Sequence, residues 1–344
     1  MRKPLSIAAS AALVLSLAIV AGAVAGPSAP KADTTTAALI SDIGRFNDRA
    51  FNQNQLLGLQ RAKAKLGVKT LALQSNSVSD YIPNMTSAVR QNADIIIAAG
   101  FLLADATATM AKKFPDTNFA ITDYPVEAPP FADAKTGKVL YKNVEGLTYA
   151  ANEGGCLVGV LAAKMAQRMG KKIIGAVGGI KIPPVDIWIA GYRHCAQKAV
   201  PGTKVLIGYS QDFVATDKCK TVAENQIAQG AQVLFQVAGQ CGLGTLKAAD
   251  QANIWGIGVD VDQYALAKKV LTSGIKRVDN GVYAAIAQVK AGKFAGGSDL
   301  FFNVKNGGIG VGKINPAVPA SDRALMNQYK AQIISGKLKP KSSL

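Results

Sequence analysis

The sequence predicts an α/β fold with two doubly wound lobes, in each of which a parallel sheet lies between two layers of helices. Two observations support this prediction. Apolar, β-branched runs alternate with helical patterns along the 344 residues, and the second set of runs repeats the spacing of the first. The composition agrees, because 49% hydrophobic and 18% charged residues with 34 glycines are typical of a compact protein and exclude fibrous and disordered classes.

Eight runs have the length and composition of buried strands. The first four cover residues 37–42, 68–74, 94–99 and 118–122, and the second four begin near residues 173, 204, 232 and 254. Corresponding runs start 136 to 138 residues apart. The two halves of the chain therefore share one layout, and each half is expected to form one lobe.

Helical patterns fill the segments between the runs. Apolar residues recur at helical spacing from Leu56 to Leu66 in the first half. In the second half, helices are predicted over residues 155–169 and 187–200, and the Pro183-Pro184 pair predicts a turn before the latter. A helix over residues 280–290 follows the eighth run and has no counterpart in the first half. We therefore expect the chain to cross between the lobes more than twice.

The N-terminal residues have the pattern of a secretory signal peptide. Arg2-Lys3 precedes a stretch without charge over residues 7–26, and Ala23-Val24-Ala25 fits a cleavage site for small residues. We expect residues 1–25 to be removed and residues 26–36 to form a flexible leader, although an uncleaved membrane anchor is the alternative. No cysteine precedes Cys156, so the expected product is exported, soluble in the periplasm or another extracytoplasmic space, and not lipid-anchored.

The charge and the histidine content exclude several classes of function. The 39 Lys and Arg against 22 Asp and Glu give a net charge of +17, but the basic residues are scattered and match no nucleic-acid-binding motif. His194 is the only histidine, which leaves little room for histidine-based catalysis or a histidine metal site. No nucleic-acid partner, catalytic set, metal or cofactor is expected.

Four cysteines lie in the second half of this chain, which permits two disulfides in an exported protein. Of the three possible pairings, we favour Cys156 with Cys195 and Cys219 with Cys241, because each pair joins successive predicted helical regions. Free, partly buried thiols are the alternative.

Polar and aromatic residues follow the predicted strands at their carboxyl ends, where parallel sheets bind ligands. If the edges of the two sheets face each other, these residues line a cleft for a small molecule. They are Asp42, Phe101, Asp123, Gly178-Gly179, Asp212-Phe213, Gly239-Gln240 and Asp260.

The residue types in this expected cleft suit a neutral ligand. Ionised Asp42, Asp123 and Asp260 accept hydrogen bonds, which fits the hydroxyls of a sugar or the N–H groups of a base. Phe51 and Phe213, one from each half, could contact both faces of a flat ring. Core packing for each phenylalanine and helix capping for each aspartate are the alternatives.

Six segments of the sequence form an ordered set of motifs. They are residues 42–53, Asn152-Glu153-Gly154, Gly178-Gly179 followed by Pro183-Pro184 and Ala190-Gly191-Tyr192, residues 235–239, residues 258–263 and residues 271–277. Together they resemble blocks of the basic membrane protein family of ABC-transporter substrate-binding proteins, the PnrA-like purine nucleoside receptors. The resemblance covers about residues 37–315, with departures at Asn47, at Ala50 and in the loop 212–218.

The resemblance implies a type I periplasmic-binding-protein fold whose lobes are joined by a hinge with three crossings. The implied N-terminal lobe holds residues 37–124 plus about 275–295, and the C-terminal lobe about 150–262 plus about 298–344. The implied protein is a monomer that captures a purine nucleoside by hinge closure and delivers it to a membrane permease.

The resemblance also assigns roles to residues of the cleft. It places the purine between Phe51 and Phe213 and the ribose hydroxyls at Asp260 and Lys276. Asp42, Asn52 and Asp123 are the remaining contacts that the resemblance implies, and Gly239, past the end of the seventh predicted strand, completes the candidate ligand residues.

Three other functions are alternatives at the level of sequence. A sugar-responsive transcription repressor could share this fold but needs an N-terminal helix-turn-helix, and the apolar export segment of this chain argues against it. A nucleoside-cleaving enzyme could use Asp42, Asp48 and Asp123 to bind a cation or activate water. A receptor for a sugar or nucleobase could serve transport or signalling.

Overall fold

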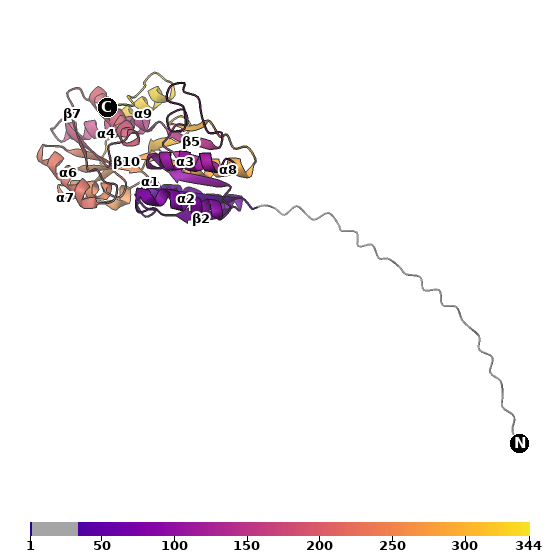
Figure 1. Ribbon diagram of the computed structural model, residues 1–344. Helices are drawn as coiled ribbons and strands as arrows, with labels where there is room; N and C mark the ends of the chain where they lie inside the picture. Colours follow the sequence, from indigo (N-terminus) through magenta and orange to yellow (C-terminus); the bar gives the residue numbers. More distant parts are fainter. Residues whose placement is uncertain (2–33) are drawn as a thin grey trace. The chain divides into compact units, whose positions relative to one another are not determined.

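The computed structural model describes Met1 and residues 34–344, whose strands form two six-stranded sheets (Figure 1). The predicted signal peptide, apart from Met1, and residues 26–33 of the predicted leader lie outside the described residues. The first strand begins at Thr36, the last residue of the predicted leader.

The first sheet has the strand order β11-β5-β4-β3-β1-β2, and its paired strands are all parallel. Helices α1 (Phe51–Leu66) and α8 (Val278–Lys290) pack together on one face of this sheet, and α2 (Tyr81–Arg90) and α3 (Ala104–Lys113) cover the other. The strands are β1 (Thr36–Ser41), β2 (Lys69–Leu73), β3 (Ile95–Ala99), β4 (Asn118–Thr122), β5 (Val144–Tyr149) and β11 (Asp299–Phe302).

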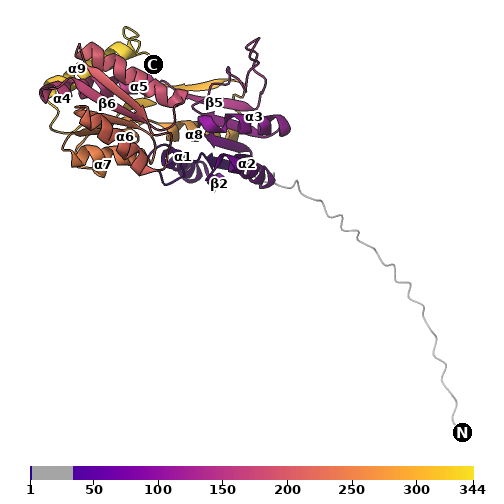
Figure 2. The same ribbon diagram turned by 60° about the vertical axis from the view of Figure 1, so that its left-hand side comes forward.

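The second sheet has the order β12-β10-β9-β8-β6-β7, in which only β12 runs antiparallel to its neighbour. Figure 2 shows α4 (Ala151–Arg168), α5 (Pro183–Ala199) and α9 (Ala320–Ile334) on one side of this sheet, and α6 (Thr216–Ala228) and α7 (Gly242–Gln251) on the other. The strands are β6 (Ile173–Gly178), β7 (Lys204–Tyr209), β8 (Val233–Val237), β9 (Trp255–Asp260), β10 (Val270–Lys276) and β12 (Ile309–Val311).

All eight predicted strands are present, so the prediction of two doubly wound α/β lobes is confirmed. The central strands form because both of their faces are covered. The side chains of β3, Ile-Ile-Ile-Ala-Ala, are all buried and alternate between the two helical layers. The edge strands β2 and β7 are more exposed and more polar.

The chain crosses between the lobes three times: after β5, after β10 and after β11. The sequence analysis placed residues from about 298 onward in the second lobe, which is wrong for β11, because this strand pairs with β5 in the first sheet. It also did not predict β5, and Pro183-Pro184 begins α5 instead of forming a turn before it. Tyr149 and Phe302, the last residues of β5 and β11, stack with ring centroids 4.9 Å apart where two of the crossings begin.

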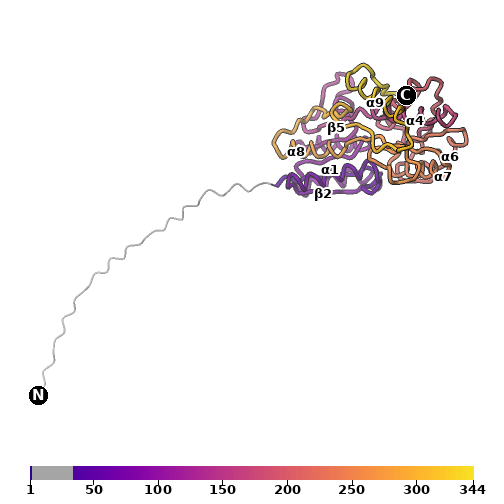
Figure 3. Tube along the Cα trace, turned by 180° about the vertical axis from the view of Figure 1, so that it is seen from behind, coloured from indigo at the N-terminus to yellow at the C-terminus, as the bar shows by residue number. Residues whose placement is uncertain are grey.

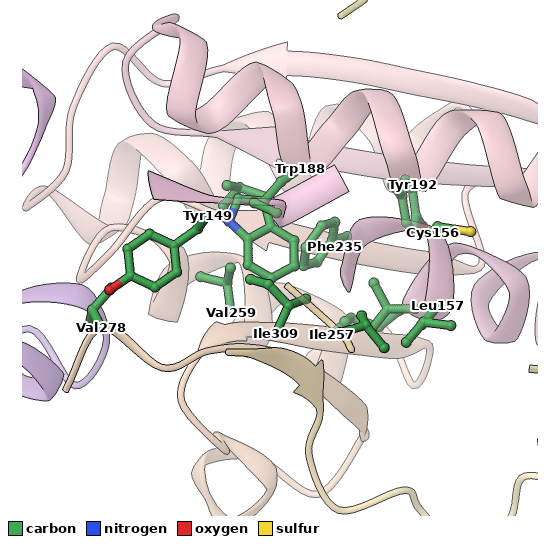
Figure 4. Packing of buried hydrophobic residues seen from close by; sticks show 14 of the residues in the cluster. Tyr149, Cys156, Leu157, Trp188, Tyr192, Phe235, Ile257, Val259, Val278 and Ile309 are labelled. Carbon is green, nitrogen blue, oxygen red and sulfur yellow. The ribbon is translucent and has the colours of Figure 1, made fainter. Parts of the chain in front are cut away.

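Helices α4 and α5 approach closely because small residues line their contact. A methyl group at Gly155 would lie 2.1 Å from the carbonyl oxygen of Trp188, and one at Gly191 would lie 2.0 Å from that of Asn152. The disulfide between Cys156 and Cys195 joins the same two helices. Figure 4 shows Trp188, Tyr192 and Phe235 packed beneath this pair, where all three side chains are buried.

The C-terminal residues run along the second lobe beside α4 and α9, as the view from behind shows (Figure 3). Asn152 Nδ2 donates a hydrogen bond to the Pro340 carbonyl at 2.8 Å, and Leu338 is buried in the core. Within the described part of the chain, none of the helices has the length and apolar character needed to span a membrane.

Candidate functional site

The carboxyl ends of strands from both sheets surround a cavity with about 570 Å³ of empty space, part of which opens to solvent. The structure brings all eight residues that the sequence analysis proposed as ligand contacts to the lining of this one cavity. They are Asp42, Phe51, Asn52, Asp123, Phe213, Gly239, Asp260 and Lys276.

Strand ends position the charged residues of the cavity. Asp42 follows β1 and Asp123 follows β4 in the first lobe, while Asp260 and Lys276 are the last residues of β9 and β10 in the second. Asp123 and Asp260 have positive φ angles of 63° and 66°, a conformation that costs free energy in residues other than glycine. The backbone turns away at these points, and the carboxylates stay in the cavity wall.

The first lobe contributes a tightly bonded acidic cluster. Asn52 Nδ2 donates to Asp42 Oδ1 at 2.7 Å and to Asp48 Oδ2 at 3.2 Å. Asp48 also accepts the backbone N–H groups of Ala50, Asn52 and Gln53 at 2.8 to 3.0 Å, which caps the N-terminus of α1. These bonds fix the first turn of α1, and hence Phe51, relative to Asp42.

Lys276 connects the two lobes inside the cavity. Its Nζ donates to Asp123 Oδ2 of the first lobe at 2.6 Å and lies 3.9 Å from Asp260 Oδ1 of the second. The same ammonium lies 4.8 Å from the centre of the Phe51 ring, within the range of a cation–π contact. Among the described residues, Lys276 is the only basic one in the lining, which contains four aspartates.

The electrostatics of the carboxylates correct one expectation from the sequence. Burial raises the pKa of Asp42 and of Asp260 from the ordinary value of 3.8 to about 7. The carboxylates of Asp48 and Asp123 add to both shifts, whereas the charge of Lys276 opposes that of Asp260. Asp42 and Asp260 were expected to be ionised. With these raised pKa values, each carboxyl group instead changes between its protonated and its ionised form near neutral pH.

Asp260 has an unused hydrogen-bonding atom. Its Oδ1 is buried and has no hydrogen-bond partner among the described residues. A buried acceptor without a donor is costly, so a ligand hydroxyl or N–H group that reached this atom would recover free energy.

Aromatic and aliphatic side chains form the rest of the lining. Phe51 begins α1, and Phe213 lies in the loop between β7 and α6, where its ring packs against the backbone of Gly179. Gly100, with φ 120°, allows the Phe51 ring to approach, because a methyl group there would lie 3.0 Å from Phe51 Cε1.

Sequence reasoning did not select the apolar residues at the start of α5. Trp188 and its neighbours in this helix line the cavity because α5 begins at Pro183, beside the end of β6. The Gly178-Gly179 and Pro183-Pro184 pairs were the available signal, since they mark a loop at the ligand-binding edge of the sheet. The lining residues not proposed as ligand contacts are Gly44, Asp48, Gly100, Phe101, Leu102, Ile182, Pro184, Val185, Trp188, Val237 and Ala238.

The cavity does not have the composition of a metal centre. In the part of the chain that the structure describes, no three His, Cys, Asp or Glu residues are grouped so that they could hold a metal ion. Asp42, Asp48 and Asp123 are bonded to Asn52, to backbone N–H groups or to Lys276, and Asp260 Oδ1 lies 3.9 Å from Lys276 Nζ. What the arrangement can do is accept hydrogen bonds from a neutral molecule with an apolar, flat part.

A second disulfide lies beside the cavity. Cys219 of α6 is bonded to Cys241, directly before α7, with their Cα atoms 5.5 Å apart. The two disulfides follow the pairing that was favoured from the sequence.

Comparison with known proteins gives a consistent result. Residues 35–341 match the family described as ABC transporter substrate-binding protein PnrA-like. The chain is 34% identical to the ABC transporter nucleoside-binding protein BmpA of Lactococcus lactis, with 96% of this chain and 97% of the relative aligned. It is 32% identical to an uncharacterized lipoprotein of Pyrococcus abyssi, over 90% of this chain and 77% of that one.

Among solved structures, an ABC transporter solute-binding protein of Aeropyrum pernix superposes with a TM-score of 0.78 at 25% sequence identity. The superposition covers 89% of this chain and 92% of the other.

Proposed function

Since the chain belongs to the PnrA-like family of ABC transporter substrate-binding proteins, we propose that it captures a purine nucleoside and delivers it to a membrane permease. A protein of this family binds a solute for a transporter and is not an enzyme. The fold is the type I periplasmic-binding-protein fold. The name of the Lactococcus lactis relative, a nucleoside-binding protein, supports the choice of ligand.

The observation that carries the proposal is the pairing of aromatic walls with hydrogen-bond acceptors in one cavity. Phe51 from the first lobe and Phe213 from the second offer flat apolar surfaces for a base, and base–aromatic stacking is worth about 1–3 kcal/mol per base. Asp260 Oδ1, which has no partner among the described residues, accepts a ribose hydroxyl. Lys276 beside it donates to a second ribose oxygen.

The acidic lining selects against anions. Four aspartates and one lysine give the lining an excess of negative charge when the carboxylates are ionised. A phosphate group brought into this cavity would face these carboxylates at low dielectric, where like charges repel strongly. The ligand is therefore a nucleoside and not a nucleotide.

Closure of the hinge accompanies binding in this proposal. Several contacts already join the lobes, among them the ion pair of Lys276 with Asp123, a 3.0 Å hydrogen bond from Asn54 Nδ2 to the Lys276 carbonyl and a 3.0 Å hydrogen bond from Gln263 Nε2 to the Arg49 carbonyl. A nucleoside that contacts both lobes adds to them and shifts the population toward the closed form. The permease then distinguishes a loaded receptor from an empty one.

The place of action follows from the same proposal. A receptor that supplies an ABC permease works outside the cytoplasmic membrane, in agreement with the export signal expected in residues 1–25. We propose a soluble monomer, although the Pyrococcus abyssi relative is named a lipoprotein.

Calorimetric titration of the refolded protein at pH 8, where Asp260 is ionised, tests the function. Inosine, adenosine and guanosine should bind without release of free base, and AMP should not bind. Asp260→Asn should weaken nucleoside binding about tenfold to a hundredfold, because a hydrogen bond to a charged group is lost. Asp262→Asn removes the same charge from an exposed residue outside the cavity and should leave the affinity unchanged.

Two results would overturn the proposal. Binding of free sugars or bases with no binding of nucleosides would identify a different receptor. Release of free base on incubation would show a nucleoside-cleaving enzyme.

A further inference from the structure

We propose that the Cys219–Cys241 disulfide is a positioning device that holds Phe213 in the wall of the ligand cavity. This inference rests on the proposed function, because it concerns the ring that stacks on the base. It assigns a role in ligand binding to a covalent bond between two residues that do not line the cavity.

Phe213 lies in a loop without regular secondary structure between β7 and α6. Its carbonyl accepts the backbone N–H of Cys241 at 3.0 Å, so the loop is bonded directly to one partner of the disulfide. Gly239, two residues earlier, lines the cavity with φ 56°, and a methyl group there would lie 3.4 Å from the Phe213 carbonyl oxygen. The segment 239–241 therefore forms the support on which the Phe213 backbone rests.

The disulfide contacts the loop on both sides of Phe213. The Oγ of Ser210 lies 3.3 Å from the sulfur of Cys219 and 3.3 Å from that of Cys241. The sulfur of Cys241 also lies 2.9 Å from the carbonyl oxygen of Ala215. Both cysteines are fully buried in a core with residues of α6, β6 and β8, so the bond is anchored in rigid elements.

Other contacts fix the two ends of the loop. The N–H groups of Ser210 and Gln211 donate to the carbonyls of Gly178 and Gly179 at 2.9 and 3.1 Å, and a methyl group at Gly244 of α7 would lie 1.9 Å from the carbonyl oxygen of Thr216, the first residue of α6. Between these ends, Asp212 accepts the N–H groups of Val214 and Ala215 and pairs with Lys218, contacts that lie within the loop and the first turn of α6. Without the disulfide, the middle of the loop around Phe213 could shift relative to the N-terminus of α7. The Phe213 ring would then be less ordered in the empty protein. Ordering it when the ligand binds would cost conformational entropy and lower the affinity.

The test compares two buried disulfides of the same chain. The variant Cys219→Ala/Cys241→Ala removes the disulfide that is proposed to position Phe213. The control variant Cys156→Ala/Cys195→Ala removes the disulfide between α4 and α5, whose two cysteines are not in the cavity lining and are not bonded to the loop. If the alanine pair at residues 219 and 241 does not fold, Cys219→Val/Cys241→Ala restores most of the lost volume.

The first measurement needs no ligand. Hydrogen exchange of the segment 210–216 in the empty protein should become about tenfold faster in the variant of Cys219 and Cys241 and stay unchanged in the control. Unchanged exchange in the former, or equal acceleration in both, would overturn the inference. This result stands even if the protein binds no nucleoside, so it separates the inference from the proposed function.

The second measurement uses inosine as the probe in a double-mutant cycle. Loss of the Cys219–Cys241 bond should weaken inosine binding about tenfold in the parent protein and in Phe51→Ala, but less than about twofold in Phe213→Ala, where no ring remains to be positioned. The same loss in all three backgrounds would show a general structural role and refute the inference.

Discussion

Replacement of Lys276 by methionine should destabilise the empty protein strongly. Methionine keeps most of the length of the lysine side chain but removes the charge from a cavity with four aspartates. The Nζ of Lys276 lies 2.6 Å from Asp123 Oδ2, and the two side chains are only 4% and 10% exposed. Solvent therefore screens this ion pair little.

The expected magnitude follows from the charge that is left behind. Removing one partner of a buried ion pair costs about 3–5 kcal/mol, because the other partner stays desolvated without compensation. The lost cation–π contact with Phe51 acts in the same direction. Because these contacts share one ammonium, they are not additive, and we expect a total loss of about 3–5 kcal/mol at pH 8.

The loss should be smaller at pH 5. The pKa of Asp260 is about 7, so at pH 5 this residue is protonated and its attraction to Lys276 is absent in the parent protein. At pH 8 Asp260 is ionised, and removal of Lys276 leaves it beside Asp123 with no cation. The destabilisation must therefore grow as the pH rises between these values.

Urea unfolding followed by tryptophan fluorescence at both pH values measures these effects, since Trp188 lies buried in the cavity wall. Lys268→Met is the control, because Lys268 is exposed and its loss changes the net charge equally. Adding Asp123→Asn to Lys276→Met should recover part of the stability at pH 8. Equal stability of the Lys276 and Lys268 variants at pH 8, or a larger loss at pH 5, would refute the reasoning.

Two further predictions concern titration and packing. Burial raises the pKa of Asp42 from 3.8 to about 7, so between these pH values the folded protein keeps a proton that the unfolded chain releases. The free energy of unfolding of the parent protein therefore falls as the pH rises through this range. Asp42→Asn has no such titration, so its melting temperature should rise relative to that of the parent as the pH is raised from about 4 to about 7, and a constant difference would contradict the pKa shift. Gly191→Ala would place a methyl group 2.0 Å from the Asn152 carbonyl oxygen and should cost about 1–3 kcal/mol or prevent folding. Gly310→Ala, where a methyl group meets nothing within 4 Å, should change the melting temperature little, so equal effects of the two variants would disprove the packing argument.

The central strands could be predicted because the apolar residues of each strand indicate that it is buried. A parallel strand covered on both faces favours a continuous apolar run, which β3 has and which only Gln236 interrupts in β8. The strand β5 contains Glu145 and Gly146, and β10 contains Thr272, Ser273 and Gly274, so neither has that pattern. Such strands are selected by their partners in the sheet. The strand β11 (Asp299–Phe302) pairs with residues 146–149 of β5, which are separated from it by about half of the sequence. No local sequence pattern indicates this pairing.

The site residues could be predicted only where they follow strands that an apolar run identifies. Asp42, Asp123 and Asp260 follow strands that the apolar runs identify, and the rule for parallel sheets places them at one edge. Lys276 ends a strand that the runs do not identify, and only the family resemblance selected it. Trp188 was interpreted as a packing residue, and α5 begins at Pro183, four residues before the predicted helix, so the place of Trp188 in the cavity wall required the structure.

The net charge of the whole chain and the charge of the cavity lining have opposite signs, so they act differently on an anionic ligand. The whole chain carries a net charge of +17, which attracts anions over long distances, whereas the cavity lining has four aspartates and one lysine. Attraction at the surface alone would favour nucleotides over nucleosides. In the cavity the order reverses, because a phosphate must lose its hydration and approach buried carboxylates, while a ribose hydroxyl supplies the donor that Asp260 Oδ1 lacks. In the proposed function, selectivity for a neutral ligand therefore comes from the buried carboxylates, and the raised pKa values of Asp42 and Asp260 reflect the free-energy cost of ionising these groups inside the protein.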